Sequence, residues 1–287
     1  MDSHTNIVII GAGAMGSAIL RGWIYSSEAP ADVLRAHNFT VVDPNADKNL
    51  ALAKEFGLLA TEDARTAADL IGAFDIVPDV VLLAVKPQII DDVMADLADL
   101  CWFKTAERTP LVVSIAAGVP TSRIEAALGG NVHVVRVMPN LPLQVSLGAS
   151  VVAKGSVATD DEAELVRDLF AALGFASLVD EEQIDVACAI SGGGPAYVAK
   201  MIEDLTQAGV ENGLPEDLAV QLATTTVGGS YKLLVEEDIT PQDLRVRVCS
   251  PGGTTLAALA AMDDVGFTRS ITAGIDAAIN RAKELAQ

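Results

Sequence analysis

The feature that most constrains this chain is a run of four apolar residues that leads directly into three spaced glycines. Residues 7–10 predict a short strand, and Gly11, Gly13 and Gly16 follow it, before a helix predicted to continue over residues 17–25. In this order the first glycine permits a tight turn, the second lets backbone N–H groups approach a pyrophosphate, and the third lets the helix pack closely on the strand. The helix N-terminus then offers unpaired N–H groups and a positive dipole end to an anion. The stretch therefore predicts a dinucleotide site.

Apolar runs alternate with helical patterns through residues 1–179, which predicts a doubly wound, Rossmann-like α/β domain. Further strands are predicted at residues 39–43, 79–85, 111–118, 132–140, 150–153 and 176–179. Helices are predicted at residues 47–56, 61–72 and 160–173. The strand at 39–43 ends in Asp43, where such folds usually bind the adenosine ribose. The later strands end in small or polar residues, at the edge where ligands of such sheets bind.

From residue 180 the strand signals stop, and residues 180–287 predict an all-α domain. Two glycine clusters interrupt its helical pattern, at residues 191–197 and 250–255. A glycine inside a helix costs about 1 kcal/mol relative to alanine, so each cluster needs a reason. For the first, a structural reason, either close helix packing or a helix that starts at Pro195, and a functional role are equally good explanations. The second cluster places a Gly-Gly pair before a helix that is predicted to start at Thr254. Backbone N–H groups and hydroxyls would then face outward and form an anion site of the size of a carboxylate. The alternative is a simple turn between two helices.

Composition narrows the class of protein further. The 287 residues are 51% apolar, which is enough for two domain cores, and no run approaches eighteen apolar residues. A formal charge of -20 disfavours nucleic acid and anionic membrane as partners and indicates a solubilising acidic surface. Three widely spaced cysteines suggest neither disulfides nor a metal site. With no readable signal peptide, the expected location is the cytoplasm.

Several motifs together resemble the pyrroline-5-carboxylate reductase family, in that family's order and over nearly the whole chain. They lie at residues 11–16, 84–88, 113–119, 136–140, 191–197 and 250–255, and the last is the most specific. The resemblance implies reduction of 1-pyrroline-5-carboxylate to L-proline by NAD(P)H, the last step of proline biosynthesis. It also implies a Rossmann-like N-terminal domain and a helical C-terminal domain that interlocks with a second subunit, often within larger rings. The chain departs from the family at Gly193, where serine is usual, and at Arg245-Val246, where Lys-Asp is usual.

The resemblance also assigns residues to the site. Thr255 stands at the position that contacts the substrate nitrogen, and it is the expected catalytic residue. The backbone N–H groups of Gly252, Gly253 and Thr254, with the Ser250 hydroxyl, are expected to hold the substrate carboxylate. The expected cofactor contacts are Gly11, Gly13, Ala14, Met15, Gly16, Asp43, Asn45, Val85, Lys86, Pro87, Ala116 and Asn140.

The residues are consistent with that chemistry. A protonated cyclic imine is already electrophilic at carbon, so an enzyme has mainly to align it and hold its carboxylate. The motifs contain no paired carboxylates, and His133 lies in a predicted core strand. The family suggests NADPH, yet an acid such as Asp43 would bond a free ribose 2′-hydroxyl and repel a 2′-phosphate, which leaves NADH possible. Asn45 and Lys48 follow closely and can offset that repulsion.

Two other functions are compatible with parts of the sequence. A β-hydroxyacid dehydrogenase shares the two-domain pattern, but Lys200 comes too late after the glycines at 192–194 to match that family's catalytic lysine. A non-catalytic dinucleotide sensor would have no reason to keep the motif at residues 250–255. Helices rich in small residues, at 219–229 and 254–261, have too little bulk to form a thick core alone, which predicts an obligate dimer.

Overall fold

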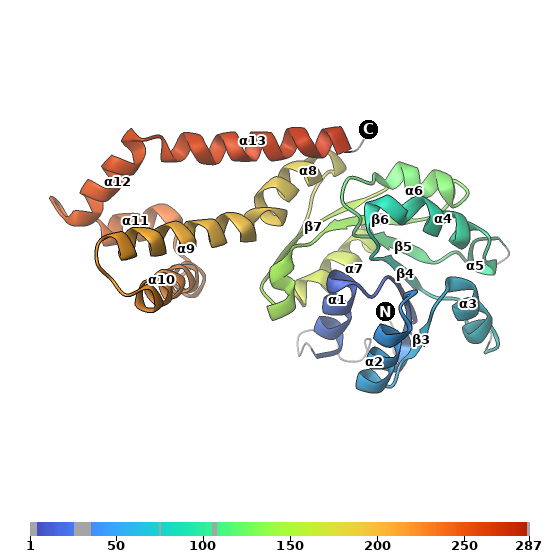
Figure 1. Cartoon of the computed structure of the whole chain (residues 1–287). Coiled ribbons are helices and arrows are strands. Elements are labelled where there is room, and N and C mark those ends of the chain that lie inside the picture. The colour runs from blue at the N-terminus through green and yellow to red at the C-terminus, as the bar shows by residue number, and fades with distance from the viewer. Residues whose placement is uncertain (1–4, 26–35, 75, 105–107, 286–287) are drawn as a thin grey trace. The chain divides into compact units, whose positions relative to one another are not determined.

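The computed structural model describes residues 5–25, 36–74, 76–104 and 108–285, and its chain divides into two compact units (Figure 1). The first unit comprises Met1–Gly192 together with Arg281–Gln287, and the second comprises Gly193–Asn280. The last strand of the first unit ends at Leu178, where the sequence pattern changes. The domain boundary at residues 179/180 stays a prediction.

The first unit is built on one eight-stranded sheet in the order β3-β2-β1-β4-β5-β6-β7-β8. The strands are β1 (Ile7–Ile10), β2 (Phe39–Val42), β3 (Leu59–Thr61), β4 (Val80–Leu83), β5 (Leu111–Ser114), β6 (Val134–Met138), β7 (Gly148–Lys154) and β8 (Gly174–Leu178). Strands β1 to β6 are parallel, β7 pairs antiparallel with β6, and β8 pairs parallel with β7. The order reverses between β1 and β4, which is the switch point where such sheets bind ligands.

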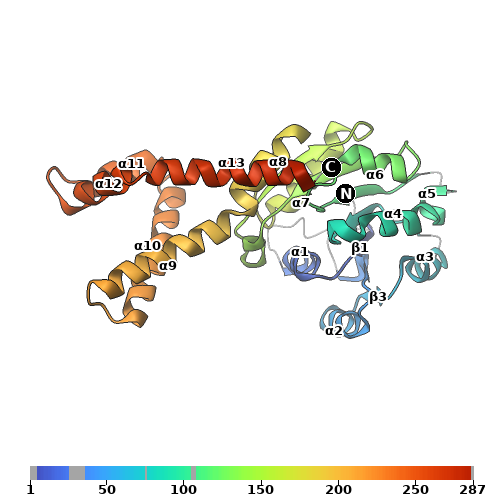
Figure 2. The same ribbon diagram turned by 45° about the horizontal axis from the view of Figure 1, so that its top comes forward.

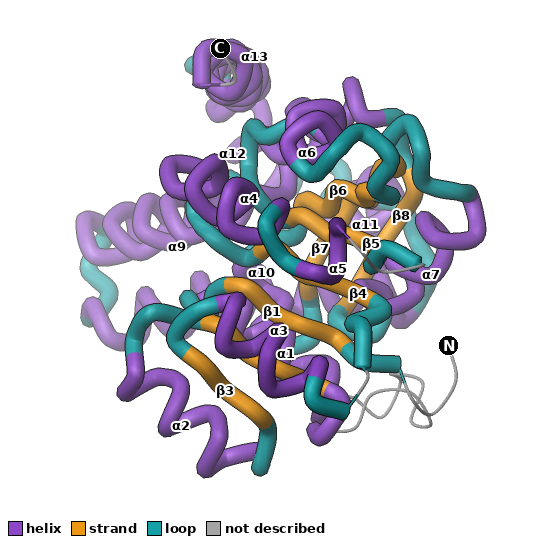
Figure 3. Tube along the Cα trace, turned by 90° about the vertical axis from the view of Figure 1, so that its right-hand side faces the viewer, coloured by secondary structure: helices purple, strands orange, loops and turns teal. Residues whose placement is uncertain are grey.

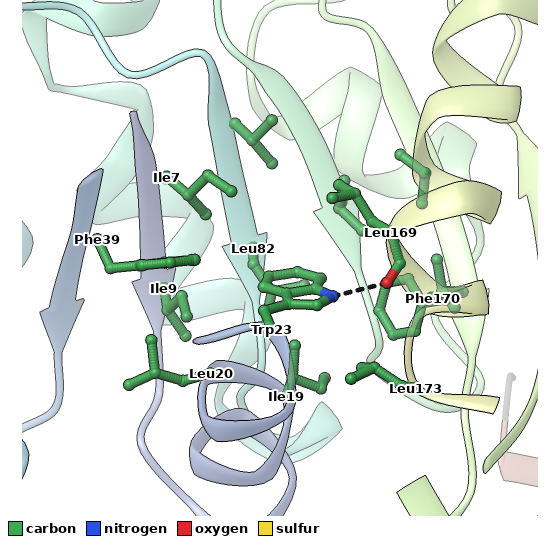
Figure 4. Close-up of a cluster of buried hydrophobic side chains, with 14 of the residues drawn as sticks. Ile7, Ile9, Ile19, Leu20, Trp23, Phe39, Leu82, Leu169, Phe170 and Leu173 are labelled. Carbon is green, nitrogen blue, oxygen red and sulfur yellow. Dashed lines mark hydrogen bonds between the residues drawn. The ribbon is translucent and has the colours of Figure 1, made fainter. Parts of the chain in front are cut away.

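Helices cover both faces of this sheet (Figure 3). The helices α1 (Ala14–Tyr25), α2 (Ala46–Phe56) and α7 (Asp160–Ala171) contribute to one buried cluster, and α3 (Ala64–Gly72), α4 (Ile90–Ala98), α5 (Cys101–Lys104) and α6 (Thr121–Ala127) contribute to the other. Trp23 of α1 is fully buried between Phe39 and Phe170, and its Nε1 donates to the Leu169 carbonyl at 2.8 Å (Figure 4). This bond ties α1 to α7 across 146 residues of sequence.

After β8 the chain contains no further strand within its described part. A short helix α8 (Ile184–Ala187) and a π-helical turn (Cys188–Gly192) complete the first unit. The second unit contains α9 (Gly194–Glu211), α10 (Glu216–Glu236), α11 (Pro241–Val248) and α12 (Thr254–Asp264), and α13 (Phe267–Leu285) follows. Figures 1 and 2 show α9 and α10 side by side as a helical hairpin. In residues 193–280 only Ala219, Ala223 and Gly266 are buried.

The expected fold class is confirmed: a Rossmann-like α/β unit is followed by helices. Three element boundaries predicted from the sequence are wrong. Residues 59–61 form the short strand β3, and the helix predicted at 61–72 starts only at Ala64, because Asp63 caps it by accepting a hydrogen bond from Thr66 N at 2.7 Å. The strands predicted at 111–118 and 132–140 end earlier, at Ser114 and Met138, because a turn with a positive φ at Gly118 follows the first and a 3₁₀ helix at Leu141–Val145 follows the second. The sequence also predicts a last helix over residues 266–287; the structure describes it at Phe267–Leu285, and residues 286 and 287 lie outside the described part.

Candidate active site

The glycine-rich turn after β1 has the geometry that its spacing predicts. Gly11 has a φ of 103°, and its N–H donates to the Val42 carbonyl at 2.7 Å. A Cβ on Gly11 would lie 2.6 Å from the Ala84 carbonyl oxygen, and a Cβ on Gly16 would lie 2.1 Å from the Gly11 carbonyl oxygen. A Cβ on Gly13, in contrast, would meet nothing within 4 Å. Two glycines thus allow close packing, while the third leaves open space beside the backbone.

A cavity of about 700 Å³ lies beside this turn and along the length of α1. Its lining includes Ala12, Gly13, Ala14, Ser17 and Lys48. The N-terminus of α1 presents its unpaired N–H groups at this point, so the donor set suits a pyrophosphate. The open Gly13, the N–H donors and the cavity together fit a dinucleotide. Met15 differs from its neighbours, because its side chain packs against the core and leaves only its backbone for a ligand.

Asp43, at the end of β2, is buried against the same turn. Its Oδ2 accepts a hydrogen bond from Ala12 N at 2.8 Å, and its Oδ1 accepts one from Asn45 N at 3.0 Å. The Lys48 ammonium lies 3.6 Å from Oδ2, and Asn45 caps α2 by accepting from Lys48 N at 3.1 Å. Asp43 therefore fastens the glycine turn to α2, whatever ribose contact it also makes.

The remaining cofactor candidates follow β4, β5 and β6. Val85, Lys86 and Pro87 come directly after β4, with Lys86 exposed and Pro87 opening a short 3₁₀ turn. Ala116 is buried after β5, and its N–H donates to Ser114 Oγ at 3.3 Å. Because β1, β2, β4, β5 and β6 are parallel, their carboxyl ends meet at one edge of the sheet. The structure thus brings the predicted cofactor residues to a single edge.

Asn140 follows β6, and its side chain is engaged within the chain. The residue is 8% exposed, its Oδ1 accepts from Ala149 N at 2.8 Å, and its Nδ2 donates to the Ser191 carbonyl at 3.0 Å. Both ends of the amide thus bond to backbone. This arrangement favours a role in holding the chain together over direct contact with the cofactor that the sequence suggested.

The predicted substrate residues lie in the second unit, between α11 and α12. Gly252 has a φ of 69°, and Gly253 is the N-cap of α12. A Cβ on Gly253 would lie 2.5 Å from Ser250 Oγ, so the hydroxyl sits directly against the start of the helix. The predicted helix start at Thr254 is confirmed. Thr254 is exposed, whereas Thr255 is half-buried.

One predicted donor in this loop is already occupied. The Gly253 N–H donates to the Ser250 carbonyl at 3.0 Å within the turn. Gly253 therefore does not offer its N–H to a carboxylate here, because the bond closes the turn that brings Ser250 Oγ to the helix. The N–H groups of Gly252 and Thr254 have no backbone partner among the described residues, and a helix leaves its first N–H groups unbonded.

Sequence reasoning missed some residues that line the cavity beside the glycine turn. Leu143, Gln144 and Ser146 lie on or after the short 3₁₀ helix at Leu141–Val145, which is far from the glycines in sequence. No motif marks them, and only the packing of that turn against α1 reveals them. Lys200, the residue weighed for the alternative dehydrogenase, pairs with Asp204, whose carboxylate raises the pKa of the lysine and keeps it charged. The described residues contain no cluster suited to a metal ion.

Comparisons with known proteins agree on one family. The family model for pyrroline-5-carboxylate reductase dimerisation matches residues 181–285, and that for NADP oxidoreductase, coenzyme F420-dependent, matches residues 6–118. A pyrroline-5-carboxylate reductase from Synechocystis is 36% identical over 278 residues, covering 96% of this chain and 97% of the relative. The Escherichia coli pyrroline-5-carboxylate reductase is 33% identical over 282 residues and covers 98% of each chain.

Solved structures give the same result in three dimensions. The pyrroline-5-carboxylate reductase of Coxiella burnetii superposes with a TM-score of 0.88 at 33% identity, covering 99% of each chain. The Plasmodium falciparum pyrroline carboxylate reductase, solved with NADP bound, superposes with a TM-score of 0.81 at 26% identity over the full length of both chains. Each comparison spans both the sheet and the helices that follow it.

Proposed function

We propose that residues 250–255 are the substrate loop of this enzyme. The chain belongs to the pyrroline-5-carboxylate reductase family and reduces 1-pyrroline-5-carboxylate to L-proline with NAD(P)H. The reaction is the last step of proline biosynthesis. The reduced nicotinamide supplies the hydride. The residues of this chain must bind the cofactor, hold the substrate and direct its imine carbon toward that hydride.

The edge of the sheet performs the first task. The turn at residues 11–16 presents backbone N–H groups to the pyrophosphate at the open Gly13, and the dipole of α1 adds favourable charge. The carboxylate of Asp43 holds Ala12 N, so the turn is already ordered before any ligand binds. A preordered site loses less entropy when it binds.

The substrate loop performs the second task. The N–H groups of Gly252 and Thr254 and the Ser250 hydroxyl hold the substrate carboxylate at the start of α12. The Thr255 hydroxyl accepts a hydrogen bond from the protonated ring nitrogen and so fixes the orientation of the imine carbon. No strong acid or base is required, because the nitrogen already carries its proton when the hydride is transferred.

The observation that carries this assignment is the bare N-terminus of α12. Its N-cap is Gly253, which provides no side-chain cap, and Thr255 Oγ1 has no hydrogen-bond partner among the described residues. A threonine that served only as a cap would accept a bond from a backbone N–H of the first turn. Thr159 and Thr240 do this for their helices, and Thr255 does not. Its half-buried hydroxyl is thus available to a ligand.

Substitution of Thr255 tests the proposal directly. We expect Thr255→Ala to lower turnover at least about tenfold, which corresponds to about 1.4 kcal/mol of barrier, because the ring nitrogen loses its partner. Affinity for NADPH should change little, and Thr255→Ser should restore much of the loss. Turnover is followed by NADPH oxidation in the presence of 1-pyrroline-5-carboxylate.

Thr159→Ala is the matched control. It removes the threonine cap of α7, whose Oγ1 accepts from Glu162 N at 3.2 Å, and should cost about 1 kcal/mol of stability with turnover unchanged. If Thr255→Ala behaves in the same way, with a lower melting temperature and full turnover, then Thr255 is not a substrate contact.

We further propose that NADPH is the preferred form of the cofactor. Lys48 lines the cavity with its side chain 48% exposed, and its ammonium is available to a 2′-phosphate. The Asn45 cap places the N-terminus of α2 beside it, and that dipole end also favours a phosphate. These two groups oppose the repulsion from Asp43, and the balance between them decides the preference.

The protein forms a homodimer through its helical half. Apolar side chains on the helices stay exposed in a single chain, including Tyr197, Met201, Leu205, Leu222 and Tyr231. We propose that the enzyme works in the cytoplasm. Within the described residues, no helix has the length and apolar character that a bilayer crossing requires. We also propose that dimers assemble into larger rings. Sedimentation at micromolar concentration tests the assembly, and a folded, active monomer would contradict it.

A further inference from the structure

Strand β6 and the two residues after it contact the segment at residues 181–192 at three points. Arg136, Met138 and Asn140 lie two residues apart, so they fall on the same face of an extended chain. Each contacts a different part of the segment that follows β8, residues 181–192. We call this set the β6 anchor.

The first contact is ionic and buried. Arg136 is 5% exposed and lies on the face of the sheet that α6 covers. Its guanidinium is 3.5 Å from the Glu181 carboxylate and 3.3 Å from that of Asp185. Glu181 also accepts from Thr121 N at 2.8 Å and from Thr121 Oγ1 at 2.7 Å. A buried guanidinium between two carboxylates has a defined position, because its N–H donors are directed at oxygens on both sides.

The second and third contacts hold the π-helical turn at Cys188–Gly192. A Cβ on Gly192 would lie 3.2 Å from the Met138 Cε and 3.0 Å from the Cys188 Sγ, so the turn packs tightly on β6. The Asn140 amide spans from Ala149 N to the Ser191 carbonyl. Isolated π-helical turns are rare and cluster at functional sites. This one ends at Gly192, the last residue before the second unit.

We propose that Asn140, as part of the β6 anchor, is a positioning residue for the reduction, because it fixes the backbone from which the second unit starts. The inference rests on the proposed function, in which the second unit carries the substrate loop. Hydride transfer tolerates little misplacement, so a loosened Ser191 should lower turnover without weakening cofactor binding. The geometry favours this role over a cofactor contact, since each end of the amide already bonds to backbone within the chain.

Asn140→Asp gives the sharpest test. The aspartate keeps an oxygen for Ala149 N, but its second oxygen faces the Ser191 carbonyl and repels it when ionised. When protonated, the same oxygen donates to that carbonyl and restores the bond. We expect kcat to be at least about tenfold lower than wild type at pH 8, to recover relative to wild type as pH falls, and NADPH Kd to stay within about twofold. Arg136 and its partners Glu181 and Asp185 are the charged groups of the anchor, and the Cys188 thiol, whose pKa burial raises, lies in the same turn. Wild type contains all four groups, so each variant rate is compared with the wild-type rate at the same pH.

A second variant and a control accompany this measurement. Glu181→Gln removes one of the two negative charges beside Arg136 at a half-buried position, and it should lower kcat about threefold. Val132→Ala removes buried apolar volume just before β6 and should lower the melting temperature while kcat stays within about twofold.

Hydrogen exchange without substrate or cofactor separates this inference from the proposed function. The amides at residues 188–192 should exchange about tenfold faster in Asn140→Asp than in wild type at pH 8. Accelerated exchange with unchanged kcat would overturn the positioning role, and unchanged exchange would overturn the anchor itself. A tenfold rise in NADPH Kd with unchanged exchange would instead make Asn140 a cofactor contact. The exchange result stands even if Thr255 proves irrelevant to the substrate.

Discussion

The molecule contains two glycine-rich turns that each precede a helix, and they are built differently. In the turn at residues 11–16, Gly11 is buried, its N–H bonds to β2, and a buried carboxylate holds Ala12. In the turn at residues 250–253, the first three residues are exposed, and one backbone bond, from Gly253 N to the Ser250 carbonyl, closes it. Both leave helix N–H groups open to an anion.

The difference shows where each site obtains its rigidity. The first turn is fixed by a sheet that one chain completes alone, so its geometry is set within the first unit. The second turn lies in helices that bury almost nothing of their own, so its final packing requires the second subunit. Substitutions in the first turn should therefore disturb the packing of the first unit, whereas those in the second turn have little packing to disturb within their own chain.

The largest effect is expected from Gly16→Ala. The new Cβ would fall 2.1 Å from the Gly11 carbonyl oxygen, a backbone atom that cannot swing away, so α1 or the turn must move. We expect NADPH affinity to fall at least about 100-fold, with a lower melting temperature, measured by fluorescence titration and calorimetry. Gly13→Ala is the matched control, since its Cβ meets only open space and should leave the melting temperature unchanged. Equal melting temperatures for the two variants would refute the claim that the first turn is fixed by packing.

A smaller effect is expected from Asp43→Ser. The substitution removes the carboxylate that holds Ala12 N and that would repel a 2′-phosphate. We expect wild type to prefer NADPH and the variant to prefer it several-fold more strongly, with weaker binding of both cofactors. The ratio of kcat/KM for NADPH to that for NADH measures this. An unchanged ratio would limit Asp43 to fastening the turn, and a wild-type preference for NADH would overturn the cofactor proposal.

The smallest effect is expected from Gly252→Ala in the exposed turn. Its φ of 69° is unfavourable for alanine, but a Cβ there has open space, so the cost should be about 1–2 kcal/mol. We expect a melting temperature lower by a few degrees and turnover within about threefold of wild type. Gly252→Asn should be milder, because asparagine tolerates this conformation. A loss of folding as severe as that of Gly16→Ala would mean that the two turns are equally rigid.

The sequence predicted the parts of the molecule whose local signal is strong. The strands β1, β2 and β4 are buried on both faces, so their sequences are continuous apolar runs, which predict strands. The spacing of the glycines predicted the turn after β1. The strand β3 was missed because three residues are too short to show a period, and its neighbour Asp63 marked the helix start only through its capping bond.

Site residues were predictable where a motif carries them and unpredictable where long-range contacts decide. The motifs predicted the open backbone at Gly13 and the helix start at Thr254, because both follow from local sequence, and the role of Thr255 stays a prediction. The role of Asn140 depends on its hydrogen bond to the Ser191 carbonyl, 51 residues away. No sequence pattern around either residue predicts this bond. The occupied N–H of Gly253 likewise depends on how the turn closes.

The exposed helices of residues 193–280 affect how stable a newly made chain is before it dimerises. The apolar faces of these helices are exposed in a single protomer and become buried when two protomers associate. Because association stabilises the folded state by mass action, the apparent stability of the protein should rise with its concentration. During synthesis the strands of the first unit emerge before these helices, and they can fold while the rest of the chain is still being made. The last step of folding, in which two protomers bury these helix faces against each other, is then bimolecular. Newly made chains at low abundance are therefore exposed to aggregation and proteolysis for longest.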